Sequence, residues 1–323
     1  MKFEELSPNG QPQQIGPTNV IRGTGLETCG LCGSFTKWRD ERLQQAVCSL
    51  ECLSALWNKA ASDDPAIVQE QNYAIFENEI KNEIEISLKH PKVYKDILIV
   101  VHNQFDYVKK CLDSVQRYTE NYRLFIWDNA SDPQTADYLK GLEDVYLYGS
   151  SENLGFIKPN NNLFEKGKSP YVILLNSDTE VFEGWADAMT GYLQEYPKVG
   201  AIGYLGGILG ADAVGQGVGF GSQIDYVCGW CLCVRRRDVT GLFDQDNLSF
   251  AYGEDSDFCL RLKEKGLDMY ALHVPLVHHF GNKTVMEVLK TRDLSSSFER
   301  NHEYLRRRWK SYLENDRVEL RRV

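Results

Sequence analysis

The stretch Asp96-Ile97-Leu98-Ile99-Val100-Val101 decides the fold of this chain. After Asp96 it is apolar without interruption, whereas a strand with one face in water alternates apolar and polar residues. An unbroken apolar run is typical of a strand buried on both faces, and such strands occur in parallel sheets covered by helices. The run therefore predicts an α/β fold that starts at Asp96.

The segments after this strand alternate between the helical period and short apolar runs. Helix patterns cover residues 105–115, 135–142, 159–165 and 182–196, and strand patterns cover residues 124–127, 145–147 and 171–175. This order predicts a Rossmann-like, mostly parallel sheet with flanking helices. We expect this part of the chain to hold a nucleotide.

Acidic residues and a histidine follow several of the predicted strands. Asp128 ends the run 124–127, Asp178 follows the run 171–175, and His278 follows the apolar residues 274–277. Ligands of open α/β sheets bind at the edge formed by the carboxyl ends of the strands. Carboxylates and an imidazole at that edge suit a divalent metal, a diphosphate and a proton acceptor. The pattern predicts a metal-dependent group transferase.

The composition is that of a soluble acidic protein. The chain has 323 residues, a formal net charge of -10 and a pI near 5.2, which argues against a surface that binds nucleic acid along its whole length. No stretch approaches the roughly 20 apolar residues that span a bilayer, and the first residues lack an apolar signal core. We expect a cytoplasmic protein. The basic run Arg306-Arg307-Arg308 near the end is interpreted as a solvated helix face.

Four of the nine cysteines have the spacing of a zinc site. They follow the pattern Cys29-x2-Cys32-x15-Cys48-x3-Cys52, in which two close pairs supply four thiolates to one tetrahedral ion. The sequence around them resembles treble-clef zinc knuckles, so we predict a structural Zn²⁺. A disulfide or unrelated thiols are the alternatives. The other five cysteines have no paired spacing and are expected to be buried thiols: Cys111, Cys228, Cys231, Cys233 and Cys259.

A helix is predicted between the cysteine module and the α/β part. Phe76, Ile80, Ile84 and Leu88 recur every four residues and form its expected buried face, while Glu83 is expected to point elsewhere. We therefore divide the chain into a tail and zinc knuckle (1–60), a connecting helix (61–95), the α/β domain (96–283) and a basic helical extension (284–323). Glycines crowd residues 200–221, which predicts a hairpin or a mobile lid.

Four motifs occur in the order found in one enzyme family: Asp128-Asn129-Ala130-Ser131-Asp132, Glu152-Asn153-Leu154-Gly155-Phe156, Leu175-Asn176-Ser177-Asp178-Thr179 and Gly253-Glu254-Asp255. Through them the chain resembles the family 2 glycosyltransferases of GT-A fold, in particular the rhamnosyltransferase-like branch. The resemblance runs from about Asp96 to Lys283. It implies an inverting, metal-dependent transfer of a sugar from a nucleotide-sugar donor to a hydroxyl acceptor.

The resemblance also implies which residues bind the donor. His102, Asn103 and Asp128 would hold the base and ribose, and Asn153, Gly155 and Phe156 would line the donor. Lys158 is a candidate cation for the diphosphate. A UDP-sugar is the favoured donor, with GDP- and dTDP-sugars as alternatives.

The metal-binding element of the family matches residues 176–178. Asp178 is its last acid and would hold Mn²⁺ or Mg²⁺ against the donor diphosphate, whereas Asn176 stands in place of the first acid. His278 matches the histidine of the family's His-x-x-Gly and would be the second metal ligand, with His279 as the alternative.

The acid pair Glu254-Asp255 would supply the catalytic base. Asp255 is predicted to remove the acceptor proton while Glu254 orients or caps, and a single displacement with one base implies inversion without a covalent intermediate. Trp230 is placed at the acceptor or sugar face, with core packing as the alternative. Asp244 contacts the acceptor or caps a turn.

The acceptor stays open at this point. A hydroxymethylated DNA base is one candidate, because a zinc knuckle and a basic tail accompany the transferase motifs; a saccharide, a lipid-linked sugar and a protein are the others. An alternative to an enzyme is a catalytically silent domain that binds a nucleotide sugar or nucleic acid as an adaptor.

Overall fold

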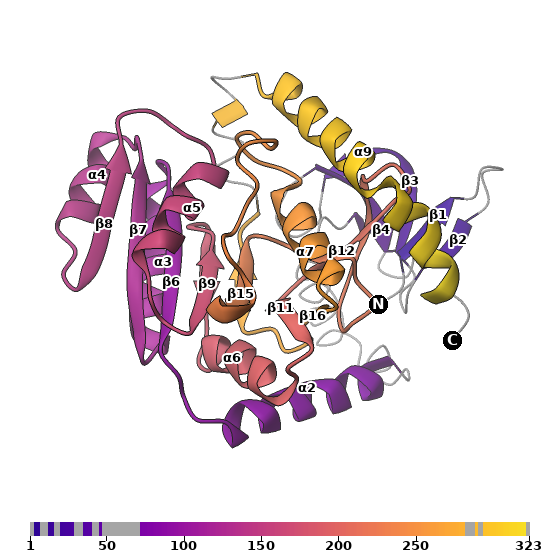
Figure 1. The fold of residues 1–323 in the computed structure, drawn as a ribbon, viewed down its shortest axis with the longest axis horizontal. Helices are drawn as coiled ribbons and strands as arrows, with labels where there is room; N and C mark the ends of the chain where they lie inside the picture. The colour runs from indigo at the N-terminus through magenta and orange to yellow at the C-terminus, as the bar shows by residue number, and fades with distance from the viewer. Residues whose placement is uncertain are drawn as a thin grey trace. The chain divides into compact units, whose positions relative to one another are not determined.

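The computed structural model describes residues 3–6, 12–15, 20–28, 35–40, 45–46, 72–281, 288–289 and 293–320, with side chains for residues 79–281, 288–289 and 293–314. The chain divides into two compact units, Met1–Glu79 and Ile80–Val323 (Figure 1). The described part of the first unit is a five-stranded sheet of order β2-β1-β3-β4-β5, formed by β1 (Phe3–Leu6), β2 (Pro12–Ile15), β3 (Val20–Thr28), β4 (Phe35–Asp40) and β5 (Gln45–Ala46). The four predicted zinc ligands Cys29, Cys32, Cys48 and Cys52 lie outside the described residues, so the zinc knuckle stays a prediction.

A seven-stranded sheet of order β16-β11-β15-β9-β6-β7-β8 forms the centre of the second unit. Its strands are β6 (Lys95–Val101), β7 (Tyr122–Asn129), β8 (Val145–Ser150), β9 (Tyr171–Leu175), β11 (Val199–Gly203), β15 (Cys231–Arg235) and β16 (Asp268–Ala271). All of them run in one direction except β15, which is antiparallel to both β9 and β11. The prediction of a mostly parallel α/β sheet is confirmed.

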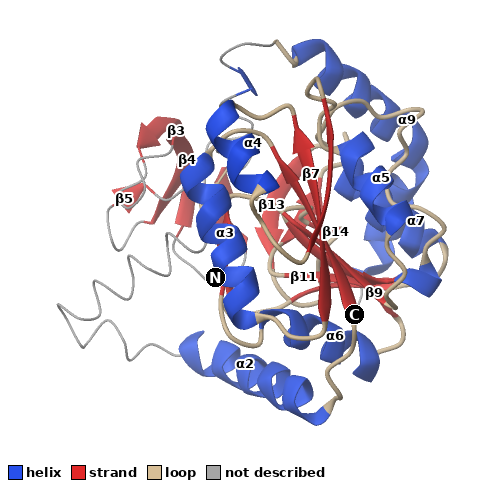
Figure 2. Cartoon of the chain, turned by 90° about the vertical axis from the view of Figure 1, so that its left-hand side faces the viewer, coloured by secondary structure: helices blue, strands red, loops and turns tan. Residues whose placement is uncertain are grey.

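Helices cover both faces of this sheet (Figure 2). On β6, Ile97, Ile99 and Val101 belong to one buried cluster and Leu98 to the other, as expected for a strand with both faces in the core. The first cluster includes side chains of α3 (Phe105–Tyr118), α4 (Pro133–Lys140) and α6 (Trp185–Glu195). The second includes side chains of α5 (Ile157–Lys166) and α7 (Glu254–Glu264). The result is a three-layer α/β/α arrangement.

The helix α2 (Asn72–Lys89) forms in the predicted segment, and Ile80 packs against the core, but the predicted buried face is wrong at Ile84 and Leu88. Ile84 is 42% exposed and Leu88 is 82% exposed, whereas Glu83 is only 1% exposed. The Glu83 carboxylate accepts hydrogen bonds from the backbone N–H groups of His273 and Val274 at 2.9 Å and from the Tyr270 hydroxyl at 3.2 Å. Because these bonds satisfy a buried charge, the polar residue and not the apolar pattern sets the orientation of the helix.

A second expectation that the structure corrects is a strand over residues 274–277. Of these residues only Val277 belongs to a strand, β17 (Val277–His279), which pairs antiparallel with β10 (Thr179–Val181) outside the seven-stranded sheet. The N–H groups of His273 and Val274 donate to Glu83, and that of Leu276 donates to the Val274 carbonyl in a turn. These donors are therefore not available for a strand ladder.

The glycine-rich segment forms a hairpin, which was one of its two predicted readings. β12 (Gly206–Leu209) pairs with β13 (Gly215–Gly219) and with β14 (Tyr226–Val227). A Cβ on Gly207 would lie 2.1 Å from the ring of Tyr226, so a glycine is needed there for this close packing. Lid motion stays a prediction. Residues 226–234 form two separate strands, because β14 ends at Val227 and β15 (Cys231–Arg235) begins four residues later.

The long helix α9 (Ser295–Leu320) carries the basic run on its exposed side. Arg306 pairs with Glu303, and Arg308 pairs with Glu264, so the run behaves largely as the solvated face that was predicted. On its other side, Leu305 and Trp309 are buried. Among the helices that the structure describes, none has the length and apolarity needed to cross a bilayer.

Four of the five cysteines expected to be buried thiols are buried, namely Cys111, Cys231, Cys233 and Cys259. Burial raises the pKa of the Cys111, Cys233 and Cys259 thiols to about 12, so these groups stay protonated at neutral pH. Cys228 is only half-buried, because it lies in the turn between β14 and β15.

We predict that Glu83→Ala lowers the free energy of unfolding by about 2–4 kcal/mol, because it leaves several buried donors without an acceptor. Urea unfolding followed by tryptophan fluorescence measures this loss. Glu85→Ala, at an exposed position of the same helix, should change the value by less than about 0.5 kcal/mol. Equal effects of the two substitutions would contradict the role assigned to Glu83.

Candidate functional site

The carboxyl ends of β6 and β9 lie side by side in the sheet. From β6 the chain continues to β7 and β8 on one side and reaches β9 on the other, which makes this pair of strands a topological switch point. His102 and Asn103 follow β6, and Asn176 follows β9. The predicted donor and metal residues therefore meet at the place where α/β sheets bind ligands.

The loop after β6 is held against the end of β7. The backbone N–H of Asn103 donates to Ser131 Oγ at 3.1 Å, and Asn103 Oδ1 accepts from the Asp132 N–H at 2.7 Å. His102 Nδ1 lies 2.9 Å from the carbonyl oxygen of Asn129. Asp128 pairs with Val101 across the two strands and accepts from the Ser131 N–H. Three predicted donor residues, His102, Asn103 and Asp128, are thus brought together at one edge.

Residues 153–156, which we call the donor loop, are fixed by the buried side chain of Asn129. Its Nδ2 donates to Asn153 Oδ1 at 2.9 Å and to the Gly155 carbonyl at 2.8 Å, and its Oδ1 accepts from the Leu154 N–H. Asn129 was quoted as part of a motif but was given no role. The structure shows that it positions the donor loop beside the ends of β6 and β7. Lys158, just after this loop, is exposed on the first turn of α5.

The contact to Asp178 comes from His279. His279 Nε2 lies 3.2 Å from Asp178 Oδ1, and the register of the β10–β17 ribbon pairs His279 with Thr179, the residue after Asp178. Successive residues of a strand point to opposite sides. His278, the predicted metal ligand, therefore points to the other side of the ribbon, where its ring lies edge-on against Phe280 at a centroid distance of 4.5 Å.

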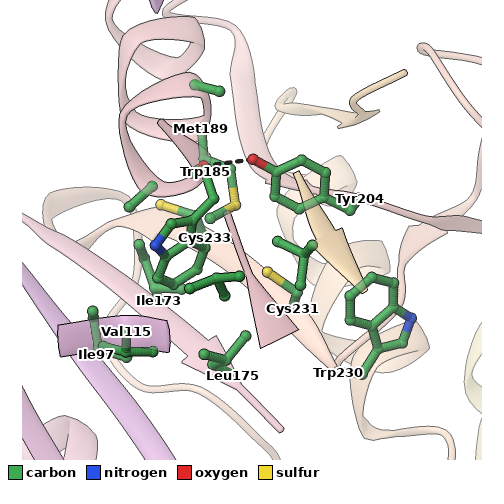
Figure 3. Close-up of a cluster of buried hydrophobic side chains, with 14 of the residues drawn as sticks. Ile97, Val115, Ile173, Leu175, Trp185, Met189, Tyr204, Trp230, Cys231 and Cys233 are labelled. Carbon is green, nitrogen blue, oxygen red and sulfur yellow. Dashed lines mark hydrogen bonds between the residues drawn. The ribbon is translucent and has the colours of Figure 1, made fainter. Parts of the chain in front are cut away.

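Trp230 is 9% exposed and belongs to the buried core, beside Tyr204 and Cys231 (Figure 3). Its ring stacks on His279 with a centroid distance of 4.8 Å and an interplanar angle of 12°. One face of the indole is thus occupied, and the rest is largely covered. The geometry corresponds to the core-packing alternative, in which Trp230 holds the His279 imidazole in place; an acceptor contact stays a prediction.

The acid pair, Glu254 and Asp255, begins α7 after Gly253, which has a positive φ of 90°. Asp255 Oδ2 accepts from the Gly229 N–H at 3.0 Å, and Oδ1 accepts from the Ser256 N–H at 2.8 Å. Since Gly229 precedes Trp230, this bond links the acid pair to the ring that supports His279. By contrast, Glu254 Oε2 is buried without a hydrogen-bond partner among the described residues.

These environments separate the two carboxyl groups chemically. Burial raises the pKa of Glu254 to about 8, and the charge of Asp255 adds to the rise. Burial also raises the pKa of Asp255, but hydrogen bonds from the Gly229 and Ser256 backbone oppose the rise. Burial thus raises the pKa of both carboxyl groups, and the backbone donors to Asp255 favour its charged form, so Glu254 retains a shared proton more readily than Asp255 does.

Tyr252 lies beside the acid pair and was given no role from the sequence. It precedes Gly253 and the acid pair, it is 40% exposed, and its φ of 73° is unusual for an aromatic residue. Its ring lies edge-on against Phe298 at a centroid distance of 4.6 Å. Burial raises the pKa of its phenol, and the carboxylates of the acid pair and of Asp178 add to the rise. A backbone in the left-handed region cannot be read from the letters Tyr-Gly, so the sequence held no clear signal for this residue.

Asp244 caps a turn. Its carboxylate accepts from the backbone N–H of Asn247 at 3.1 Å and from the Asn247 side chain at 2.8 Å, and it also accepts from the Tyr304 hydroxyl at 2.8 Å. These bonds correspond to one of the two predicted readings; the acceptor contact stays a prediction.

Few side chains near Asp178 and His279 could act as metal ligands. Within the described ranges, no group of three or more His, Cys, Asp or Glu side chains is placed to hold a metal ion. A carboxylate and an imidazole nevertheless fit a divalent ion whose other ligands are substrate phosphates and water, which is the usual way in which nucleotide-dependent enzymes hold Mg²⁺. The residues present therefore fit a metal that binds together with its substrate.

Residues 96–213 match the family described as Glycosyl transferase family 2. The matched segment contains β6, Asp128, the donor loop and Asp178, and it ends before Trp230 and the acid pair. The resemblance inferred from the motifs is confirmed for this segment.

Two curated relatives match the chain at low identity, and one of them has a transferase name. Rhamnosyltransferase WbbL of Escherichia coli (strain K12) is 23% identical over 243 residues, which cover 62% of this chain and 90% of that protein. Uncharacterized protein y4gI of Sinorhizobium fredii (strain NBRC 101917 / NGR234) is also 23% identical, over 253 residues that cover 67% of this chain and 27% of that protein.

Two solved structures are similar in part. The mannosyltransferase PcManGT from Pyrobaculum calidifontis, in complex with GDP-Man and Mn²⁺, is 14% identical with a TM-score of 0.45, and the match covers 61% of this chain and 63% of that one. S. aureus TarS is 13% identical with a TM-score of 0.43, covering 55% of this chain and 35% of that one.

We predict that Glu254→Gln removes a pH dependence of stability. The folded pKa of Glu254, about 8, lies above the ordinary value of 4.5, so the wild type binds an extra proton when folded and loses stability as pH rises from about 4.5 to 8. Urea unfolding at pH 5 and pH 8.5 should show this loss, on the order of 2 kcal/mol, in the wild type and a smaller one in the variant. The same loss in both proteins would contradict the assigned protonation.

Proposed function

We propose that this protein is an inverting glycosyltransferase that moves a sugar from a nucleotide-sugar donor to a hydroxyl acceptor with the help of a divalent metal ion. One observation carries the proposal: His279 contacts Asp178 and stacks on Trp230, and the neighbouring Gly229 donates to Asp255 of the acid pair. The family match over residues 96–213 supports the transferase class.

The donor is bound at the ends of β6 and β7. His102, Asn103 and Asp128 hold the nucleoside, and the donor loop lines the sugar diphosphate, with Lys158 as the nearest candidate cation. UDP-, GDP- and dTDP-sugars all fit this description. A hexosyl group is the favoured sugar, because the relative named rhamnosyltransferase transfers a deoxyhexose by its name.

Asp178 and His279 are the residues that would hold Mn²⁺ or Mg²⁺. A bound divalent ion would neutralise the charge that develops on the leaving diphosphate. The imidazole is held for this role by its stacking on Trp230 and by the β10–β17 register. We therefore propose His279, the alternative named from the sequence, in preference to His278.

Asp255 acts as the general base. Its carboxylate is oriented by the N–H groups of Gly229 and Ser256, and the neighbouring Glu254 retains its proton. Asp255 takes the proton of the acceptor hydroxyl while the acceptor oxygen bonds to the anomeric carbon, and the bond from that carbon to the diphosphate breaks. One displacement from the face opposite the leaving group inverts the anomeric centre.

The acceptor is proposed to be a neutral hydroxyl compound, with a saccharide ahead of DNA. The carboxylates of Asp178 and Asp255 would repel a polyanion from the site. Arg306 and Arg308 of the basic run are paired with acids and offer little free charge to phosphates. A hydroxymethylated DNA base remains the second acceptor to test.

Asp255→Asn is expected to lower sugar transfer by about 10²–10⁴-fold while the donor dissociation constant changes by less than about threefold. Turnover is measured with UDP-, GDP- and dTDP-sugars plus Mn²⁺, offering methyl glycosides beside duplex DNA with hydroxymethylated bases, and binding is measured by calorimetry. Asp246→Asn, at an exposed position of a nearby loop, is the matched control. A wild type that binds a donor without turning it over would favour the adaptor reading.

His279→Phe keeps a ring on Trp230 but removes the nitrogen that faces Asp178, so the Mn²⁺ concentration for half-maximal turnover should rise by about tenfold or more. His278→Phe is the matched change on the neighbouring residue and should leave that concentration nearly unaltered. The reverse order of effects would return the ligand role to His278. Metal-independent turnover in the presence of EDTA would overturn the metal requirement itself.

A further inference from the structure

Asn301 is a fully buried polar residue on the buried side of α9. It is 0% exposed and lies at the same four-residue spacing as Leu305 and Trp309, so it belongs to the stripe that packs against the rest of the unit. Burying a carboxamide is unfavourable unless its hydrogen bonds are satisfied. Its partners therefore show what the residue is for.

All described hydrogen bonds of the Asn301 side chain go to one short segment, residues 249–253, which we call the bracket loop. Oδ1 accepts from the Ser249 N–H at 3.0 Å. Nδ2 lies within 2.9–3.0 Å of the carbonyl oxygens of Ser249, Ala251 and Tyr252. One carboxamide thus binds the backbone of most of the loop.

The bracket loop has a conformation that its own residues do not favour. Phe250 has a φ of 64°, Tyr252 a φ of 73° and Gly253 a φ of 90°. A non-glycine residue in this region costs about 1–2 kcal/mol and persists only where surrounding contacts impose it. The bonds from Asn301 are among the contacts that hold it here, together with those of Phe250 to the N–H groups of Phe156 and Ile157.

The bracket loop is hydrogen-bonded through Phe250 to the end of the donor loop. The Phe250 carbonyl accepts from the N–H groups of Phe156 at 2.6 Å and of Ile157 at 3.3 Å. A Cβ on Gly155 would lie 2.5 Å from the same oxygen, which shows how closely the two loops approach. A shift of Phe250 would therefore move the donor loop.

The end of the bracket loop sets the start of α7. Gly253 is the N-terminal cap of the helix, its carbonyl accepts from the Asp257 N–H at 2.9 Å, and the acid pair follows it directly. A Cβ on Gly253 would lie 2.6 Å from Leu305 Cδ1, so α9 contacts this end of the loop as well. The same short segment thus connects the donor loop with the acid pair.

We propose that Asn301 is a positioning residue, which holds the bracket loop so that the donor loop and the acid pair keep a single relative placement. The inference extends the proposed function to a helix outside the matched residues 96–213, and its catalytic consequence rests on that function. The coupling between the two loops does not rest on it. A misplacement of about 1 Å at a reacting group can cost 10²-fold in rate, so such a holder is needed.

Trp309 provides the matched comparison. It lies on the same stripe of α9, it is also buried, and its Nε1 donates to Asp257 Oδ1 at 3.0 Å. It thus ties α9 to α7 through one side-chain bond that bypasses the bracket loop. Trp309→Phe removes an anchor of the helix, whereas Asn301→Ala removes the holder of the loop.

Hydrogen exchange followed by mass spectrometry tests the coupling without any substrate. In Asn301→Ala, the amides of residues 249–253 and those of Phe156 and Ile157 should exchange faster by about tenfold or more, because the acceptor Phe250 is no longer fixed. In Trp309→Phe, the amides of residues 154–157 should stay within about threefold of the wild type. Unchanged protection of Phe156 and Ile157 in Asn301→Ala would overturn the proposal. Asn301→Ser, which keeps a hydroxyl, serves if the alanine variant does not fold.

Donor turnover with Mn²⁺ and the nucleotide-sugar panel tests the consequence for the site. Asn301→Ala should lower kcat by about 10–100-fold. The acidic limb of its profile of kcat against pH should move to lower pH, because water that reaches the acid pair lowers the raised pKa values. Trp309→Phe should leave the position of that limb unchanged. An unmoved limb with full kcat in Asn301→Ala would overturn the positioning role. A wild type without turnover would contradict the proposed function instead, and the exchange result would still decide whether Asn301 couples the two loops.

Discussion

The reversed direction of one strand, β15, is the constraint on which the arrangement of the site depends. Because β15 is antiparallel to its neighbours, its first residues lie where the parallel strands end. The carbonyl of Trp230 accepts from the Asn176 N–H at 2.8 Å, and the residue before it, Gly229, donates to Asp255. With the Trp230 ring stacked on His279, one reversed strand connects the contact between His279 and Asp178 to the acid pair.

The second constraint is electrostatic. Asp178, Glu254 and Asp255 place three acids in a region largely closed to water, and one oxygen of Glu254 has no hydrogen-bond partner within the described part of the chain. A buried carboxyl group without full hydrogen bonding lowers the free energy of unfolding at neutral pH, and proteins retain such groups mainly at functional sites. A concentration of acids also favours a divalent cation and a proton acceptor over an anionic acceptor molecule. Charge, burial and the family match thus support the same class of reaction.

The differences between the sequence predictions and the structure have identifiable causes. The prediction of which face of α2 is buried was wrong at Ile84 and Leu88. An apolar period of four does not reveal that Glu83 accepts hydrogen bonds from the backbone of residues 273–274. His279 contacts Asp178 across 101 residues of sequence, and two adjacent histidines do not reveal from the sequence which of them makes this contact. The same imidazole covers one face of Trp230. Tyr252 and Asn301 were not given roles, since strain and buried side-chain bonds leave no periodic pattern.

The sequence by itself determined the fold class and the chemical classes of the site residues. Unbroken apolar runs specify strands buried on both faces, and acids placed at strand ends and at the start of a helix specify where polar chemistry occurs, because both are local properties of the chain. Only the tertiary structure decided which side chains meet. The contacts of Glu83 with residues 270–274, of Asp178 with His279 and of Asn301 with residues 249–252 join segments from about 50 to 190 residues apart. Such pairings depend on register, strain and burial, which exist only once the chain has folded.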